Sequence, residues 1–81
     1  MVSDDQTKNN IAENLRRILE SRGLEQKFLA DATGENQMTI SRIVRGKNVP
    51  GAGVLARIAE ALDVSIDRLV QAPPESVKNS Q

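Results

Sequence analysis

Residues 26–46 of the chain read QKFLADATGENQMTISRIVRG, the most informative part of the sequence. Apolar residues recur at helical spacing in two short runs, and Gly34 stands between them. Glycine readily takes the left-handed backbone conformation that ends many helices. The pattern therefore predicts two short helices, over about 25–32 and 37–45, joined by a tight turn at 33–35. The first of these helices should bury Leu29 together with either Ala30 or Ala32.

The second predicted helix has an apolar side and a polar side. Successive helical residues lie about 100° apart, so Ile40, Ile43 and Val44 share one side. The opposite side carries Met38, Ser41, Arg42 and Arg45. Asn36 should cap the start of this helix and Gly46 should end it. Two helices joined by a glycine-containing turn form the layout of a helix-turn-helix, whose second helix fits a B-DNA major groove about 12 Å wide.

Helical periodicity continues outside this stretch, and no segment alternates like a strand. Upstream, Asn10 has the position of a helix cap, with Glu13 three residues later as in a capping box. It precedes an apolar stripe that Gly23 ends, made of Ile11, Leu15, Ile18 and Leu19. Downstream, a helix over 52–62 should bury Val54, Leu55, Ile58, Ala59 and Leu62.

After that helix, Ser65 should cap a last short turn that contains Ile66, Leu69 and Val70. The fold class is therefore all-α, a compact bundle of four to five helices. We expect one helix-turn-helix domain at residues 9–71. A flexible polar N-terminal arm should occupy 1–8, and a disordered polar tail 72–81.

Composition argues against an enzyme. The 81 residues include 11 basic and 11 acidic ones, and neither histidine nor cysteine occurs. Thiolate metal sites, disulfides and the commonest general base are thus excluded. No carboxylate pair stands out, and Gly51 and Gly53 lack the remainder of a phosphate-binding motif. We predict no catalytic residues, no metal and no cofactor.

Charge and hydropathy limit the kinds of partner that the chain can bind. Residues 26–47 include four basic and two acidic side chains, a net charge of +2 within a neutral chain. This is too modest an excess for indiscriminate binding of polyanions. No apolar run approaches the roughly 18 residues of a membrane span, and the polar start is unlike a signal peptide. We expect no membrane contact and a cytoplasmic location.

The stretch from about Ile11 to Val70 resembles the Cro/repressor-type helix-turn-helix family, also called the XRE family. The residues that carry the resemblance are Leu24, Gln26, Leu29, Ala30, Gly34, Thr39, Ile40, Ser41, Arg42, Ile43, Arg45, Gly46, Lys47, Pro50, Leu55, Ile58, Ala59, Ala61, Leu62, Val64, Ser65 and Leu69. The resemblance implies a helix bundle of the type found in phage-repressor DNA-binding domains. It also implies sequence-specific binding of double-stranded DNA by a transcriptional regulator, with a repressor as the expected type.

Three departures from the family pattern stand out. The turn is more polar than is usual, because Thr33 and Glu35 stand where apolar residues are common. Glu25 replaces the usual Ser or Thr cap of the first motif helix. Many members pair an arginine with a glutamate where this chain has Leu19 and Val44. Both positions have become apolar here, which fits a salt bridge exchanged for packing.

The resemblance also implies roles for single residues. Four are candidates for base reading: Gln37, Met38, Ser41 and Arg42. Gln37 would read adenine or bind a phosphate, whereas Arg42 would bond guanine or contact a phosphate only. Met38 could touch a thymine methyl group or merely cover the neighbouring turn, and Ser41 would permit close approach. The candidates for phosphate binding are Gln26, Asn36, Arg45, Lys47 and Asn48.

Family proteins of this size act as homodimers on pseudo-palindromic operators. We expect the dimer interface at Ile66, Leu69 and Val70. An alternative function is a protein-interaction module of the same fold, such as an antitoxin or an adaptor. The near-zero net charge and the residues Met38 and Phe28, if exposed, would suit such a module.

Overall fold

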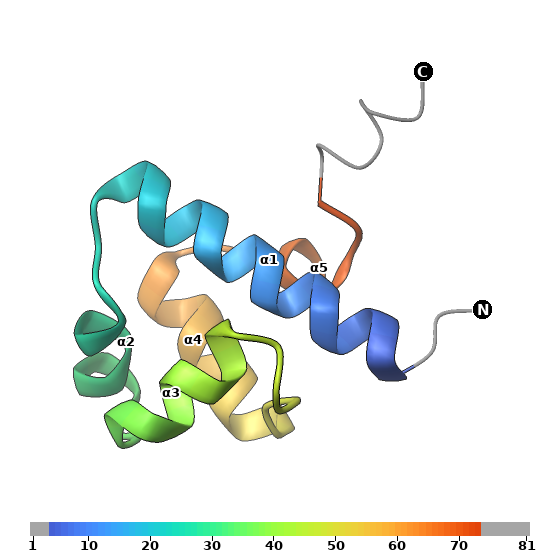
Figure 1. Ribbon diagram of the computed structural model, residues 1–81. Coiled ribbons are helices and arrows are strands. Elements are labelled where there is room, and N and C mark those ends of the chain that lie inside the picture. Colours follow the sequence, from blue (N-terminus) through green and yellow to red (C-terminus); the bar gives the residue numbers. More distant parts are fainter. Residues whose placement is uncertain (1–3, 74–81) are drawn as a thin grey trace.

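Five α-helices follow one another in the computed structural model, which describes residues 4–73. They are α1 (Asp4–Arg22), α2 (Gln26–Thr33), α3 (Gln37–Val44), α4 (Ala52–Leu62) and α5 (Ile66–Val70) (Figure 1). No strand occurs among these residues, so the predicted all-α class is confirmed. None of the helices within 4–73 combines the length and the apolar character that a bilayer-crossing segment needs.

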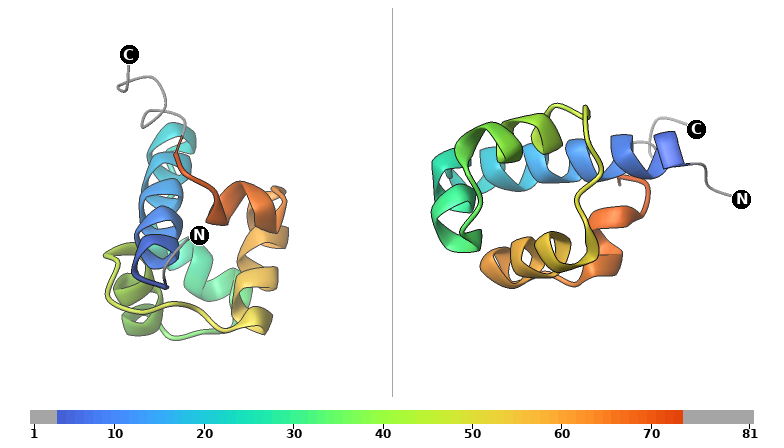
Figure 2. Two further views of the ribbon diagram at one scale, coloured as in Figure 1. Left: turned by 90° about the vertical axis from the view of Figure 1, so that its right-hand side faces the viewer. Right: turned by 90° about the horizontal axis from the view of Figure 1, so that it is seen from below.

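The helices enclose a core that the apolar stripes of the sequence supply. In the right-hand view of Figure 2, α1 and α4 run on opposite sides, α2 closes one end and α5 lies at the other. The longest helix, α1, packs against α3 and α5, whereas α2 packs against α3 and α4. The largest fully buried side chains are Ile11, Leu15, Leu29, Ile40, Ile43, Ile58, Leu62 and Leu69. Burial of this shared apolar surface is what holds such short helices in place.

The start of the first helix differs from the prediction. Helix α1 begins at Asp4, so residues 4–8 of the predicted flexible arm are helical, while 1–3 lie outside the described residues. Asn10 lies inside α1 and is buried; its Nδ2 donates to the carbonyl oxygen of Val70 at 3.0 Å. The prediction of a cap at Asn10 was wrong because the side chain bonds to α5, which is distant in the sequence.

The caps of the shorter helices follow the sequence closely. Helix α4 has the predicted bounds. The side chains of Asn36 and Ser65 accept from the backbone N–H groups of Thr39 and Arg68, as cap residues do. Glu25 precedes α2 without a side-chain cap bond, as its residue type indicated.

Burial departs from the prediction at three places. Thr33 is buried at the end of α2, which the sequence did not predict, whereas Leu29 and Ala30 are buried within the predicted alternatives. Helix α2 begins and ends one residue later than predicted. Val54 and Leu55 are only partly buried. Pro73 is buried too, so packing continues into the predicted tail 72–81, of which residues 74–81 lie outside the described part.

Candidate nucleic-acid interface

The outer face of α3 presents the polar side chains that the sequence singled out. Helix α3 buries Ile40, Ile43 and Val44 against the core. Gln37, Met38 and Arg42 are exposed on the other side, and Ser41 is partly exposed. Met38 is 73% exposed, which is unusual for a large apolar side chain. The four predicted base-reading residues therefore share one face.

The two ends of α3 are closed in different ways. At its start, Asn36 Oδ1 accepts from the backbone N–H of Thr39 at 2.7 Å, which leaves the Asn36 amide nitrogen free to donate outward. At its end, Gly46 takes a left-handed backbone conformation with φ of 78°. Residues other than glycine adopt this conformation only at a cost in free energy. The chain turns there beside Ala12 of α1.

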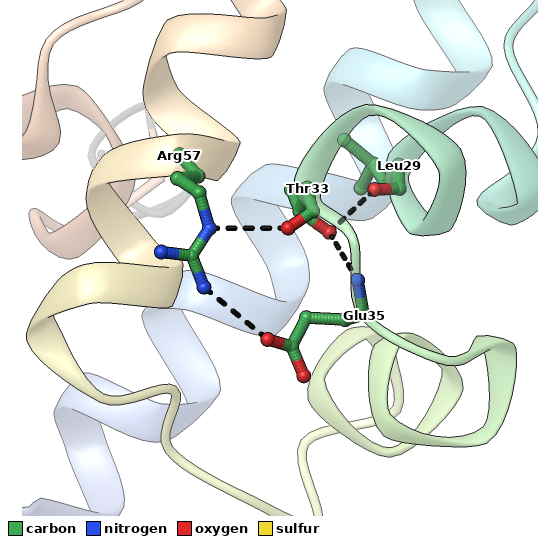
Figure 3. Close-up of polar contacts among 4 residues, drawn as sticks. All are labelled: Leu29, Thr33, Glu35 and Arg57. Carbon is green, nitrogen blue, oxygen red and sulfur yellow. Dashed lines mark hydrogen bonds and ion pairs between the residues drawn. The ribbon is translucent and has the colours of Figure 1, made fainter.

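The turn between α2 and α3 is stabilised by polar contacts rather than by buried apolar side chains. The buried Thr33 Oγ1 donates to the Leu29 carbonyl at 2.7 Å and accepts from the Glu35 N–H at 3.3 Å. From α4, Arg57 Nε donates to the Thr33 carbonyl at 3.1 Å, and its Nη2 contacts Glu35 Oε2 at 3.2 Å (Figure 3). The polar departures at Thr33 and Glu35 thus form one network with Arg57.

Arg57 is a residue that the sequence reading missed. It stands 24 residues after Thr33 and 22 after Glu35, so no local spacing pairs them. The only indication of such a residue in the sequence was the polar turn itself. Its polar groups required a hydrogen-bonding partner, but the sequence did not show where that partner was. The guanidinium links the end of α2 and the turn to α4, and so it fixes the direction in which α3 leaves the turn.

A second missed residue lies at the other end of α3. Arg16 Nη1, from α1, donates to the carbonyl oxygen of Val44 at 2.7 Å. A cation at the last carbonyl groups also suits the helix dipole. Leu19 and Val44 are both buried in the core cluster, which agrees with packing in place of the family salt bridge.

Several predicted phosphate-binding residues gather beside α3. Gln26 at the start of α2, Gln37 at the start of α3 and Arg45 just after α3 all line one open groove of about 630 Å³. Lys47 lies in the following loop, and neither it nor Arg45 pairs with a carboxylate among residues 4–73. Asn48 contacts Arg42 instead of standing alone.

One predicted dimer residue is wrong. Leu69 is fully buried in the core, and its carbonyl accepts from Asn14 Nδ2 at 2.7 Å, so it has no surface to offer a second chain. Its helical position turns it toward α1 rather than outward. Ile66 is 42% exposed, and Val70 is partly buried.

Sequence comparison assigns the chain to a family. The sequence model of the helix-turn-helix family matches residues 15–69, which include α2, the turn, α3 and α4. The chain belongs to the XRE-type helix-turn-helix family. The family membership that the resemblance indicated is thereby confirmed.

Similar proteins include a transcriptional regulator, a hypothetical transcription factor and a controller protein. The uncharacterized HTH-type transcriptional regulator y4dL of Sinorhizobium fredii is 39% identical over 57 residues, which cover 70% of this chain and 29% of that regulator. The hypothetical transcription factor NHTF from Neisseria has 25% identity and a TM-score of 0.79, with 98% of this chain and 92% of that chain covered. The restriction-modification controller protein C.AhdI from Aeromonas hydrophila has 25% identity and a TM-score of 0.71, with 83% and 98% covered.

The comparisons indicate the general function of the α3 surface. The helix-turn-helix family and the transcriptional regulator among its relatives support a DNA-binding regulator. The match spans 29% of the length of y4dL, so the comparison concerns that part of the regulator alone.

Proposed function

We propose that this helix-turn-helix protein is a sequence-specific double-stranded-DNA-binding transcriptional regulator. It acts as a repressor in the cytoplasm, without catalysing a reaction, and reads the major groove with α3. The observation that carries the proposal is the outer face of α3, where Gln37, Met38 and Arg42 are exposed. The end of this helix is bonded to α1 through Arg16, and the turn that precedes it is bonded to α4 through Arg57. A rigid helix with polar side chains suits direct contact with base edges.

The proposed base contacts follow from side-chain chemistry. Arg42 bonds O6 and N7 of a guanine through two N–H groups, and Gln37 bonds N6 and N7 of an adenine. Met38 contacts a thymine methyl group, because its exposed thioether chain offers apolar surface at that place. Ser41 is small, and it allows the helix to come close to the bases.

The proposed phosphate contacts surround this face. Gln26 and Asn36 lie at the starts of α2 and α3, where free backbone N–H groups and the helix dipole favour an anion. Arg45 and Lys47 supply positive charge beyond the end of α3. Because the whole chain carries no net charge, this local excess accounts for the attraction to DNA.

A homodimer on a pseudo-palindromic operator completes the proposal. Ile66, with Val70 beside it, is the exposed apolar part of α5 that a second copy would cover. Two copies related by a twofold axis would meet half-sites about 34 Å apart, one turn of B-DNA.

Selection from random DNA tests this function. The immobilised protein is incubated with random duplexes at about 0.15 M salt, where non-specific binding is weak, and the bound fraction is sequenced. An enriched inverted repeat is expected, and its half-site spacing reports the dimer. Arg42→Ala serves as the matched variant and should lose the preference at one base pair. If the wild-type protein enriches no sequence, the proposal fails, and the protein-interaction module becomes the better hypothesis.

A further inference from the structure

A contact at the end of α3 joins a proposed base-reading residue to the loop that follows. In one orientation of the Asn48 amide, its oxygen accepts from Arg42 Nη2 at 3.4 Å. With the amide turned over, its oxygen accepts from Arg42 Nε at 3.1 Å and its nitrogen donates to the Lys47 carbonyl at 2.9 Å. The second orientation satisfies both ends of the amide, so Asn48 links the guanidinium to the backbone of the loop.

This contact leaves Arg42 able to read a base. The guanidinium is a planar fork of five N–H donors, of which Nε uses one for Asn48. Its outer edge, formed by Nη1 and Nη2, keeps two donors side by side. A guanine O6 and N7 pair accepts two such parallel bonds. The contact with Asn48 and the contact with a base can therefore exist in the same side-chain conformation.

We propose that Asn48 is a positioning residue that orients Arg42 for base reading and so raises the preference at the base pair that Arg42 contacts. This inference rests on the DNA-binding function proposed above. Arg42 is exposed, and an exposed arginine loses rotamer freedom when a ligand orders it. A side chain already restrained by Asn48 loses less of that freedom on binding.

The positioning role differs measurably from the phosphate contact that the sequence predicted for Asn48. A phosphate contact adds affinity for every DNA sequence, because the backbone is the same in all of them. Orientation of Arg42 adds affinity only where Arg42 has its preferred base. The dependence on salt does not separate the two roles, since a neutral amide releases no counterion in either case. Base preference at one position does separate them.

The experiment measures dissociation constants on the duplex selected above and on its three variants at the base pair whose preference Arg42→Ala relaxes. Asn48→Ala should reduce the preference at that base pair by about 2- to 12-fold. This is the loss in affinity expected when the Arg42 side chain must be immobilised on binding and is not already restrained. It should leave the preferences at other base pairs unchanged. In the Arg42→Ala background, Asn48→Ala should have no further effect on base preference.

Asn48→Asp is the matched control. A carboxylate accepts from the Arg42 guanidinium as the amide oxygen does, although it cannot donate to the Lys47 carbonyl. It also repels phosphates, because both carry negative charge. This variant should keep the base preference while it binds every duplex more weakly. Thermal unfolding of each variant checks that the fold is intact.

Three results would overturn the proposal. The first is an equal loss on all four duplexes in Asn48→Ala, and the second is an undiminished loss in the Arg42→Ala background. The third is an Arg42→Ala variant that relaxes no base preference while the wild type is still selective, since Arg42 would then have nothing to read. A wild type without any selectivity would instead refute the DNA-reading function itself.

Discussion

Arg57 offers the sharpest test of how the turn before α3 is stabilised. Its guanidinium makes two contacts, one to the Thr33 carbonyl and one to the Glu35 carboxylate. Substitution by methionine removes both but keeps an aliphatic stem of similar length. The fold should survive, because the core residues are unchanged.

The expected loss follows from exposure. The side chains of Arg57 and Glu35 are 48% and 28% exposed, so their ion pair is partly screened and contributes about 0.2–1 kcal/mol. The bond to the Thr33 carbonyl contributes about another 1 kcal/mol, the value of an ordinary hydrogen bond, because solvent screens the half-exposed guanidinium. Arg57→Met should therefore lower the free energy of unfolding by about 1–2 kcal/mol, or the melting temperature by about 4–16 °C in a domain of this size.

Urea denaturation followed by circular dichroism at 222 nm measures this loss, and Glu35→Gln is the matched variant. Glu35→Gln weakens only the ion pair, so its cost should stay near 0.5 kcal/mol. The difference between the two variants reports the bond to the Thr33 carbonyl. If Arg57→Met costs no more than Glu35→Gln, the guanidinium does not stabilise the end of α2, and the reasoning is wrong.

Three further outcomes are expected from the same structure. Asn36→Ala removes the cap of α3 and should cost about 1 kcal/mol in the same denaturation assay, whereas a change within error would show that the cap bond contributes nothing. Leu69→Ala should lower the free energy of unfolding by about 2–5 kcal/mol because it opens a cavity in the core. Ile66→Glu should weaken self-association, measured by sedimentation, without a comparable loss of monomer stability. A Leu69→Ala variant that loses self-association but keeps its stability would contradict the burial of Leu69. Lys47→Ala should weaken binding to cognate and random duplexes alike and reduce the salt slope by about one, and a loss confined to the cognate duplex would exclude a phosphate contact.

Local features of the fold were open to prediction. The bounds of α4, the caps Asn36 and Ser65, and the left-handed Gly34 with φ of 78° depend on neighbours within a few residues. Apolar spacing likewise identified the buried face of α3. The exposed face followed from the same periodicity, and with it the candidate base-reading residues.

Contacts between distant residues were not open to prediction. Asn10 has the residue type and the spacing of a cap, yet it bonds to α5, 60 residues away. Leu69 has the apolar character that a dimer interface or a core equally requires, and only its packing against α1 assigns it to the core.

The short helices, the caps Asn36 and Ser65 and the amphipathic face of α3 were therefore determined by the order of residues along the chain, because the forces behind them act within one or two helical turns. The tertiary structure alone decided which polar side chain meets which backbone carbonyl. Arg16 reaches Val44, Arg57 reaches Thr33 and Asn14 reaches Leu69 only because packing of the helices brings them together. Those three bonds stabilise the orientation of the helices, since carbonyl groups at helix ends lack partners within their own helix.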